Sequence, residues 1–417
     1  MSTSKPIMRL ILLCWVAFVF TTNAQPTSLK LTKPESVSMS GDSLKRMDNH
    51  FHRLVDAKQL AGIQTAVMRN GQLIHFDSYG YANIEAKKLL DEKSIFRIFS
   101  MTKPIVSVAL MQLYEKGKFK LEDPIHKYLP EFKNMRVYRD SAMFVAQKPI
   151  RVIDLLRHTS GFSYGRSRYP ELNRRYAAAN LRAAKTNREY IQKLSKLPLQ
   201  FEPNTDWQYG LSTNICGYLV EVLSGLSLDD YLQQHIFTLL GMKDTHFQLP
   251  KNKIERFTVG YGWRASSGLR IVETQSDNRY VRKVTLFNGG GGLVSTTLDY
   301  LKFCQMILNK GTFNGKRILN KTTVELMLRD HLQGVRRVQA RLRLPAGEAG
   351  FGLGFVIKGA SANQLEKVYG WGGAVGTYFR IDTQNKLIYI LMIQLSPYRQ
   401  LGLQRLMQNY VNAAMIK

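Results

Sequence analysis

Acidic residues are scarce in this sequence. Its 417 residues include 31 Asp and Glu against 59 Lys and Arg, which gives a formal net charge of +28. Hydrophobic residues make up 44% of the chain and aromatic residues 11%. This composition excludes an intrinsically disordered chain and indicates a globular protein with a large buried core. The positive excess should keep the protein soluble and draw it toward anionic surfaces.

Motifs for nucleic-acid binding are missing. Basic residues concentrate in residues 166–196 and 336–343, but no zinc finger, helix-turn-helix or RNA-binding aromatic pattern accompanies them. We interpret both stretches as solvated faces and expect no nucleic-acid partner. Outside a cell, the anionic partner that such a charge favours is an envelope surface of anionic polymers or lipid head groups.

Cysteine is rare. Of the three cysteines, Cys14 lies near the start of the chain, and Cys216 and Cys304 lie in apolar helical patterns. The latter two are expected to be buried, and two positions do not decide whether they form a disulfide. The eight histidines are scattered and form no metal-binding motif. We therefore expect no metal ion and no other cofactor.

Long hydrophobic runs are absent beyond the start of the chain. Residues 1–24 combine a positive start at Lys5 and Arg9, an apolar run over residues 10–20, and small residues before Gln25. The apolar run falls short of the roughly 20 residues needed to span a bilayer. We expect a cleaved signal peptide in preference to a membrane anchor, and hence an exported protein that is periplasmic or secreted. No transmembrane span is expected in the mature chain.

Hydrophobic periodicity divides the remaining chain into strands near both ends and helices between them. The Asn70-Gly71 pair marks a tight turn between two strands. The predicted elements are a helix at 40–60, a hairpin at 62–68 and 72–80, a short strand at 96–99, a buried helix at 105–113, helices at 150–158, 171–197, 213–223 and 227–239, strands at 367–370, 376–382 and 386–395, and a last helix at 401–415.

This order of elements predicts an α/β (α+β) fold. One antiparallel sheet is formed by the N- and C-terminal segments, helices flank it, and a mainly helical lobe is inserted in the middle. We expect residues 25–417 to form a single domain, with its α/β part at about 37–120 and 285–417 and the helical lobe at about 121–284. Residues 25–36 and 331–349 are predicted to be loops or linkers.

Ser163 lies in a motif that its surroundings do not support. Residues 161–165 match G-x-S-x-G, the nucleophile elbow, which needs a strand before the serine and an apolar helix after it. The preceding residues have a helical pattern, and the following ones are charged and interrupted by Pro170. We therefore do not assign Ser163 as a nucleophile.

Ser100 and Lys103 form an S-x-x-K pair at the start of the predicted buried helix. A spacing of three places both side chains on one face of the first turn, so the amine can reach the hydroxyl. Burial should lower the pKa of Lys103 and make its amine a proton acceptor. The free N–H groups at the helix start would stabilise an oxyanion. Taken alone, the pair is better explained by an ordinary helix cap with a lysine whose amine reaches solvent.

Four further motifs accompany this pair. They are Leu155–Gly161 with its H-T-S-G segment, Tyr209-Gly210-Leu211 at a helix entry, the glycine-rich Gly289–Leu293, and Trp371-Gly372-Gly373-Ala374 on a C-terminal strand. The ordered set resembles the serine β-lactamase and penicillin-binding-protein superfamily, and within it the class C β-lactamases and the family VIII carboxylesterases. The resemblance covers about residues 40–415.

The resemblance implies an acyl-enzyme mechanism. Ser100 takes the place of the acylated nucleophile, Lys103 that of the motif lysine, and Tyr209 that of the proton-transferring tyrosine. The chemistry agrees, because a phenol beside a lysine can take the Ser100 proton and later return one to the leaving alcohol. The implied oxyanion hole consists of the backbone N–H groups of Ser100 and Ala374.

Two departures from the family pattern bear on the substrate. Leu211 stands where β-lactamases usually have asparagine, and Trp371-Gly372-Gly373 replaces K-T-G or H-T-G. An indole has no charge with which to bind the carboxylate of an antibiotic or a peptidoglycan stem. The W-G-G version resembles the esterases. We therefore predict hydrolysis of uncharged acyl esters, with Leu211 and residues 371–374 at the substrate.

Aromatic residues near the motifs are candidates for an acyl or alcohol pocket, although we favour a core or surface position for each. These are Tyr164, Tyr169, Trp207 and Trp263. We interpret His158 as a structural histidine of the H-T-S-G turn and not as a general base.

The sequence therefore predicts a secreted serine hydrolase, with a carboxylesterase acting on a small-molecule ester or amide as the first hypothesis. Two alternatives stay open. One is a β-lactamase or D-alanyl-D-alanine carboxypeptidase of the same fold, and the other is a non-catalytic relative that binds the cell envelope.

Overall fold

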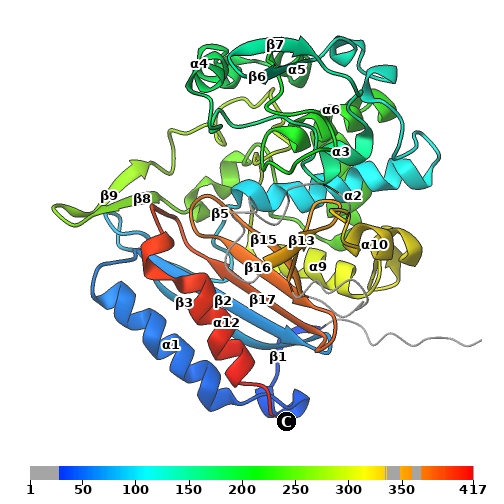
Figure 1. Ribbon diagram of the computed structural model, residues 1–417. Coiled ribbons are helices and arrows are strands. Elements are labelled where there is room, and N and C mark those ends of the chain that lie inside the picture. Colours follow the sequence, from blue (N-terminus) through cyan, green and yellow to red (C-terminus); the bar gives the residue numbers. More distant parts are fainter. Residues whose placement is uncertain (1–27, 334, 336–347, 359–367, 417) are drawn as a thin grey trace, which may run out of the picture.

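A nine-stranded sheet forms the centre of the molecule (Figure 1). The structure, a computed structural model, describes residues 28–333, 335, 348–358 and 368–416, so the predicted signal peptide lies outside the described residues. The strand order is β1-β3-β2-β17-β16-β15-β14-β13, with β4 paired to β3. The strands are β1 (Ser28–Leu31), β2 (Gly62–Arg69), β3 (Gln72–Asn83), β4 (Lys88–Leu89), β13 (Glu348–Phe351), β14 (Val356–Lys358), β15 (Val368–Gly372), β16 (Tyr378–Asp382) and β17 (Leu387–Met392).

The strand order joins segments from opposite ends of the chain. β2 pairs antiparallel with β17, and Val67 lies opposite Tyr389. The other neighbouring strands are antiparallel as well, apart from the parallel pair β1 and β3. The predicted fold class, an antiparallel sheet built from the N- and C-terminal segments with a helical lobe between them, is confirmed.

Helices cover both faces of this sheet, because its central strands are apolar on both sides. Val67 of β2 packs in a core shared with α1 and α12, whereas its neighbour Ala66 packs in the core that contains α2 and α9. In Figure 1, α1 and α12 lie on the near face of the sheet. These helices span Gly41–Asp56 (α1), Thr102–Glu115 (α2), Thr297–Leu308 (α9) and Leu403–Ala413 (α12).

The inserted lobe lies above the sheet in Figure 1, and α2 runs along the boundary between them. Its helices are α3 (Val152–Leu156), α4 (Pro170–Ala178), α5 (Asn187–Leu194), α6 (Ser212–Ser224), α7 (Leu228–Leu232) and α8 (Thr238–Leu240), and α10 (Lys321–Leu328) lies beside the sheet. Short strands complete the structure: β5 (Phe96–Arg97), β6 (Arg136–Arg139), β7 (Ala142–Val145), β8 (Gly260–Arg264), β9 (Gly268–Glu273), β10 (Val294–Ser295), β11 (Thr312–Phe313), β12 (Lys316–Arg317) and β18 (Leu395–Ser396).

The lobe differs from the sequence prediction in several places. The helix predicted at 171–197 is divided into α4 and α5, because Asn180 adopts a left-handed conformation with φ 41°. The helix predicted at 227–239 contains a π-helical stretch, Gln233–Phe237. The hairpins β6–β7 and β8–β9 were not predicted.

Local predictions near the N-terminus have mixed outcomes. The hairpin of β2 and β3 is confirmed, and its turn residues Asn70 and Gly71 have φ values of 51° and 76°, as an Asn-Gly turn requires. The prediction of a loop at 25–36 was wrong in part, since β1 and a 3₁₀ turn at Pro34–Val37 lie there.

Most of the loop predicted at 331–349 lies outside the described residues.

The two later cysteines do not form a disulfide. Cys216 and Cys304 are buried and free, and burial raises the pKa of both thiols. Within the described ranges, no helix has the length and hydrophobicity to span a membrane. The same ranges hold no cluster of three or more His, Cys, Asp or Glu side chains arranged to bind a metal ion.

Candidate active site

Ser100 lies in the tight turn that leads into α2. Phe99 has a φ of 42°, and a 3₁₀ turn over Phe99–Met101 continues directly into the helix. The turn places Ser100 at the N-terminal end of α2, one turn before Lys103. Because α2 is apolar nearly all round, it is buried on every side. Lys103 is therefore only 2% exposed, beside the serine hydroxyl.

The ammonium group of Lys103 has three hydrogen-bond acceptors. Its Nζ donates to Ser100 Oγ at 3.3 Å, to the Tyr164 hydroxyl at 3.1 Å and to the carbonyl oxygen of Gly290 at 2.5 Å. A charged lysine has three N–H bonds to donate. All three are thus satisfied inside the protein, which favours the charged form.

The pKa of Lys103 corrects the expectation from the sequence. Burial by itself lowers the pKa of this ammonium, but the nearby oxygens of Tyr164 and Tyr209 raise it. As a result, the pKa of Lys103 lies above the ordinary value for lysine. The prediction of a lowered pKa was wrong, because it counted burial and not the polar groups around the amine. Lys103 is a cation that stabilises negative charge beside it.

Tyr209 brings a phenol to the hydroxyl of Ser100. Its oxygen lies 2.7 Å from Ser100 Oγ, and the indole Nε1–H of Trp371 donates to the same phenolic oxygen at 3.2 Å. The Lys103 ammonium lies 4.7 Å from the centre of the Tyr209 ring. An N–H donor therefore contacts the oxygen that faces Ser100, and a cation lies near the ring that carries this oxygen. The structure brings together Ser100, Lys103, Tyr209 and Trp371 from three separate motifs.

The G-x-S-x-G segment contributes its tyrosine and not its serine. Ser163 is buried, and its Oγ accepts hydrogen bonds from the backbone N–H groups of Gly165 and Arg166 at 3.1 and 3.3 Å, so it stabilises a turn. The Tyr164 hydroxyl instead reaches Lys103. Burial of that hydroxyl raises the pKa of Tyr164, so this tyrosine stays protonated at neutral pH.

Gly210 explains how these two tyrosines come together. A Cβ atom at this position would lie 2.3 Å from the carbonyl oxygen of Phe162. Only glycine allows the backbone before α6 to pack this closely against the turn that carries Tyr164. The ring centres of Tyr164 and Tyr209 are consequently 5.5 Å apart.

The end of β15 packs against the serine turn. A Cβ atom at Gly373 would lie 2.7 Å from the carbonyl oxygen of Ile98 and 2.1 Å from Thr377 Oγ1, so this position also needs glycine. Gly372 is the last residue of β15 and pairs with Tyr378. The backbone N–H of Ala374, which follows, donates to no acceptor among the described residues. The predicted oxyanion role of this N–H stays a prediction.

Aromatic rings form one wall of the site. Trp371 packs edge-on against Phe351 at 5.5 Å between ring centres, and Trp207 packs against Phe351 at 5.6 Å. His158 lies behind Tyr209 with ring centres 5.0 Å apart. Burial, together with the charge of Lys103, lowers the pKa of His158 to about 3, so its ring is neutral at pH 7.

The remaining predicted site residues have these positions. Leu211 is 7% exposed, packs in the main core and directly precedes α6, so its predicted substrate contact is untested. Tyr169 packs against Tyr138, and Trp263 packs on the core of α1 and α12, away from the serine cluster. The sequence did not identify the Gly290 carbonyl as a partner of Lys103, although the glycine-rich motif marked its position.

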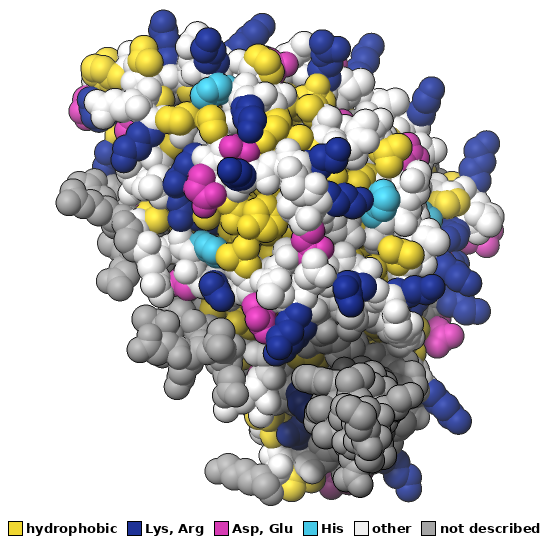
Figure 2. Space-filling model, turned by 90° about the vertical axis from the view of Figure 1, so that its right-hand side faces the viewer, with side chains coloured by type: hydrophobic (Ala, Val, Ile, Leu, Met, Phe, Trp, Pro, Cys, Tyr) yellow, Lys and Arg dark blue, Asp and Glu magenta, His cyan; other side chains and the backbone are white. Residues whose placement is uncertain are grey.

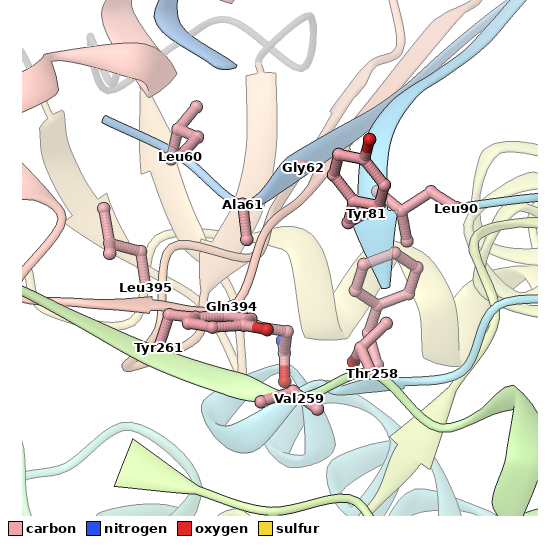
Figure 3. A pocket seen from close by; sticks show the side chains of 11 residues that line it. Leu60, Ala61, Gly62, Tyr81, Leu90, Thr258, Val259, Tyr261, Gln394 and Leu395 are labelled. Carbon is pink, nitrogen blue, oxygen red and sulfur yellow. The ribbon is translucent and has the colours of Figure 1, made fainter. Parts of the chain in front are cut away.

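A separate cavity lies near the ends of β2 and β17 (Figure 3). In this part of the structure, the side chain of Gln394 is hydrogen-bonded to the backbone of Arg97. Neither Ser100 nor any of its partners lines the cavity, so it does not belong to the site described above. The lining residues are Leu60, Ala61, Gly62, Tyr81, Leu90, Phe96, Thr258, Val259, Tyr261, Gln394 and Leu395.

Comparison with known proteins agrees with this geometry. Residues 47–408 match the Beta-lactamase family. The chain is 30% identical to Protein Rv1367c of Mycobacterium tuberculosis, over 83% of this chain and 89% of that protein. It is 27% identical to Esterase EstB of Burkholderia gladioli, over 86% and 92%. The solved structure of simvastatin synthase (LovD) from Aspergillus terreus superposes with a TM-score of 0.76 at 24% identity, over 90% of this chain and 98% of that one.

Proposed function

The chain belongs to the β-lactamase family and is a serine hydrolase, and we propose that it is a carboxylesterase that hydrolyses uncharged acyl esters through an acyl-enzyme on Ser100. The observation that carries this proposal is the hydrogen bond from Trp371 Nε1 to the Tyr209 oxygen. Trp371 stands where β-lactamases have a cation or histidine, and its only polar group is directed to the tyrosine. Trp371 therefore provides no positive charge at this position to bind a substrate carboxylate.

The mechanism begins with the removal of the Ser100 proton by the Tyr209 oxygen, 2.7 Å away. For this step Tyr209 must be a phenolate, which the Lys103 cation and the Trp371 N–H stabilise. Ser100 Oγ then attacks the ester carbonyl, and the backbone N–H groups of Ser100 and Ala374 hold the oxyanion. Tyr209 returns the proton to the leaving alcohol. Water, deprotonated by Tyr209, releases the acid and regenerates Ser100.

The apolar character of the neighbouring wall supports an uncharged acyl group as the substrate. Trp207, Phe351 and Trp371 form a cluster that includes Leu332 and Val356. Trp371 is partly exposed, whereas Trp207 and Phe351 are buried behind it. The apolar ring of Trp371 offers no partner for a carboxylate. The esterase relative EstB is consistent with this chemistry.

One observation favours a second candidate, hydrolysis of a carboxylate-bearing β-lactam or D-alanyl peptide. The guanidinium of Arg279 lies 5.4 Å from the ring centre of Phe99, the residue before Ser100, and Arg279 is exposed. An arginine there would supply the charge that Trp371 lacks. Arg279→Gln should then abolish turnover of carboxylate substrates and leave neutral esters unaffected.

The deciding experiment compares p-nitrophenyl esters of short fatty acids with nitrocefin, a β-lactam. We expect ester turnover to dominate, and an acyl-phosphonate to add one adduct mass at Ser100 in the parent and none in Ser100→Ala. Faster nitrocefin turnover would overturn the proposal in favour of the second candidate. Absence of labelling in the folded parent would indicate a non-catalytic relative.

A matched variant tests the role of Trp371. Trp371→Phe keeps an aromatic ring and removes the N–H that reaches Tyr209. Loss of a hydrogen bond to a charged oxygen is worth about 1.5–3 kcal/mol, so we expect kcat for esters to fall about 10- to 100-fold. An unchanged kcat in a folded variant would contradict the assigned contact.

We also propose that the protein is exported, with residues 1–24 removed as a signal peptide. The positive start and the apolar run of this segment support the proposal. Expression of the full sequence in a bacterial host, followed by N-terminal sequencing of the protein from each fraction, tests it. A mature protein that begins near Gln25 outside the cytoplasm is expected. An intact N-terminus confined to the cytoplasm would refute it.

A further inference from the structure

The hairpin β6–β7 presents an apolar strand to solvent. All four residues of β7 are exposed, and Met143, Phe144 and Val145 are 40%, 44% and 69% exposed. β6 is fixed to the lobe, because Tyr138 N–H donates to the Leu199 carbonyl at 2.8 Å and Leu199 N–H donates to the Arg136 carbonyl at 2.7 Å. β7 is therefore a well-held edge strand whose large apolar side chains lack cover among the described residues. Such an edge invites a partner.

The surroundings of this hairpin are strongly basic. Residues 133–196 contain fifteen Lys or Arg against four Asp or Glu, and twelve of these basic residues are exposed. In Figure 2, dark-blue Lys and Arg side chains line the upper end of the molecule, with yellow side chains between them. This is the end that carries β6, β7, α4 and α5 in Figure 1.

Arginine and apolar groups meet within the hairpin itself. The Arg139 guanidinium lies 4.7 Å from the ring centre of Phe144. Arg139 is 57% exposed, and its ion-pair partner, Asp140 at the turn, is 3.8 Å away and 82% exposed, so the pair is weak. An aromatic ring topped by an exposed guanidinium fits a lipid interface, where the ring enters the head-group region and the cation meets phosphate.

The combination of exposed apolar side chains with many basic residues favours one of three possible partners. A second copy of this chain would bring two basic ends together, and repulsion between them opposes such a dimer. An anionic polymer would satisfy the basic residues and leave Met143, Phe144 and Val145 in water. An anionic lipid surface satisfies both, because it offers phosphate charge and an apolar layer directly beneath it.

We propose that the β6–β7 hairpin docks this protein on an anionic lipid bilayer, with Met143, Phe144 and Val145 entering the head-group region and the surrounding Lys and Arg contacting lipid phosphates. The docking goes beyond the proposed esterase activity and does not depend on it.

Vesicle sedimentation tests the proposal. The full chain, with Ser100→Ala to prevent turnover, is mixed with vesicles of phosphatidylcholine alone or with 30% phosphatidylglycerol. We expect binding to the anionic vesicles that weakens as salt is raised. Phe144→Asp/Val145→Asp should weaken it at least about fivefold, and Arg136→Gln/Arg139→Gln should weaken it and reduce its salt dependence. All variants carry the same residues 1–27, so any contribution of that segment cancels.

Val272→Asp is the matched control. Val272 is 56% exposed and lies on β9, in a different hairpin. This variant should bind like the parent, and circular dichroism should show every variant folded. The proposal is overturned if Phe144→Asp/Val145→Asp binds as tightly as the parent, or if Val272→Asp weakens binding equally. It is also overturned if the parent binds heparin, an anionic polymer, but no vesicle, or if gel filtration shows a dimer that Val145→Asp dissociates.

Discussion

At the residue scale, the charge of Lys103 distinguishes the proposed mechanism from one in which lysine accepts the proton. Ser100, Tyr164 and Gly290 accept its three hydrogen bonds, and its pKa lies above the ordinary value. A lysine held in this way has no free electron pair at neutral pH. In the proposed mechanism the proton of Ser100 therefore goes to Tyr209, and the two tyrosines beside Lys103 should have different functions.

Removal of one hydroxyl at a time separates the two tyrosines. Tyr209→Phe removes the oxygen that lies 2.7 Å from Ser100 Oγ, and we expect kcat for esters to fall about 10²- to 10⁴-fold. Tyr164→Phe is the matched control, since it removes a hydroxyl that contacts Lys103. The loss of kcat in Tyr164→Phe should be at least tenfold smaller than the loss in Tyr209→Phe. Steady-state kinetics with esters measures both values of kcat. Equal losses of kcat in the two variants would show that Tyr209 has no special role in proton transfer.

His158 should make stability sensitive to acid. Its pKa in the folded protein is about 3, below the roughly 6.5 of an unfolded chain. Between these values the unfolded chain binds a proton that the folded chain does not, so stability is full above pH 6.5 and falls as the pH drops toward 3. From pH 7 to 5 this histidine should cost about 2 kcal/mol of unfolding free energy.

Urea denaturation at pH 7 and pH 5 measures this effect. His158 has a φ of 60°, a conformation that asparagine tolerates, so His158→Asn is the suitable variant. The variant should lose about 2 kcal/mol less than the parent between the two pH values. The same pH dependence in both proteins would refute a neutral, buried imidazole.

The sequence identified part of this site. Ser100 and Lys103 form a local pair, and the resemblance of the ordered motifs to a known family added Tyr209, so these three residues were candidates before the structure. Tyr164 and Gly290 contact Lys103 across 61 and 187 residues of chain. No local pattern encodes such contacts. Burial of Lys103 was foreseen, but the direction of its pKa shift depends on these distant oxygens and could not be.

At the element scale, long apolar patterns were predicted more reliably than short ones. β17 is buried at every residue and α2 is buried nearly all round, and continuous apolar runs indicate both. β7 is short and exposed throughout, so neither alternation nor a buried run reveals it. The break between α4 and α5 depends on one left-handed residue, Asn180, in an otherwise helical pattern.

The junction of two elements at Gly210 yields a prediction. In Gly210→Ala the new methyl group would meet the Phe162 carbonyl at 2.3 Å and push the Tyr164 turn away from Tyr209. We expect kcat to fall more than tenfold and the melting temperature to drop. Gly225→Ala is the control: its φ of 75° makes alanine cost about 1–2 kcal/mol, but the new methyl meets no atom within 4 Å. Its kcat should stay at the parent value.

If Gly210→Ala retained full activity, the close packing of these segments would not position the tyrosines. Thermal unfolding followed by circular dichroism gives the stability of both variants, so a general loss of structure can be separated from a local displacement at the site.

At the scale of the whole molecule, the architecture followed from the order of elements. Strand patterns at both ends and helices between them predicted one sheet closed by the two terminal segments, and β2 does pair with β17. The order of the strands within the sheet and their register could not be predicted in this way. The alignment of Val67 with Tyr389 results from packing against helices on both faces, which no single segment specifies.

The pairing of β2 with β17 also has a consequence for biosynthesis. Residues 62–69 leave the ribosome about 320 residues before residues 387–392, the strand that completes the middle of the sheet. Until β17 is made, the apolar edge of β2 in the β2–β3 hairpin has no partner strand. Pairing of two segments so far apart in the chain is slow. Refolding from denaturant should therefore compete with aggregation, and its yield should fall as protein concentration rises.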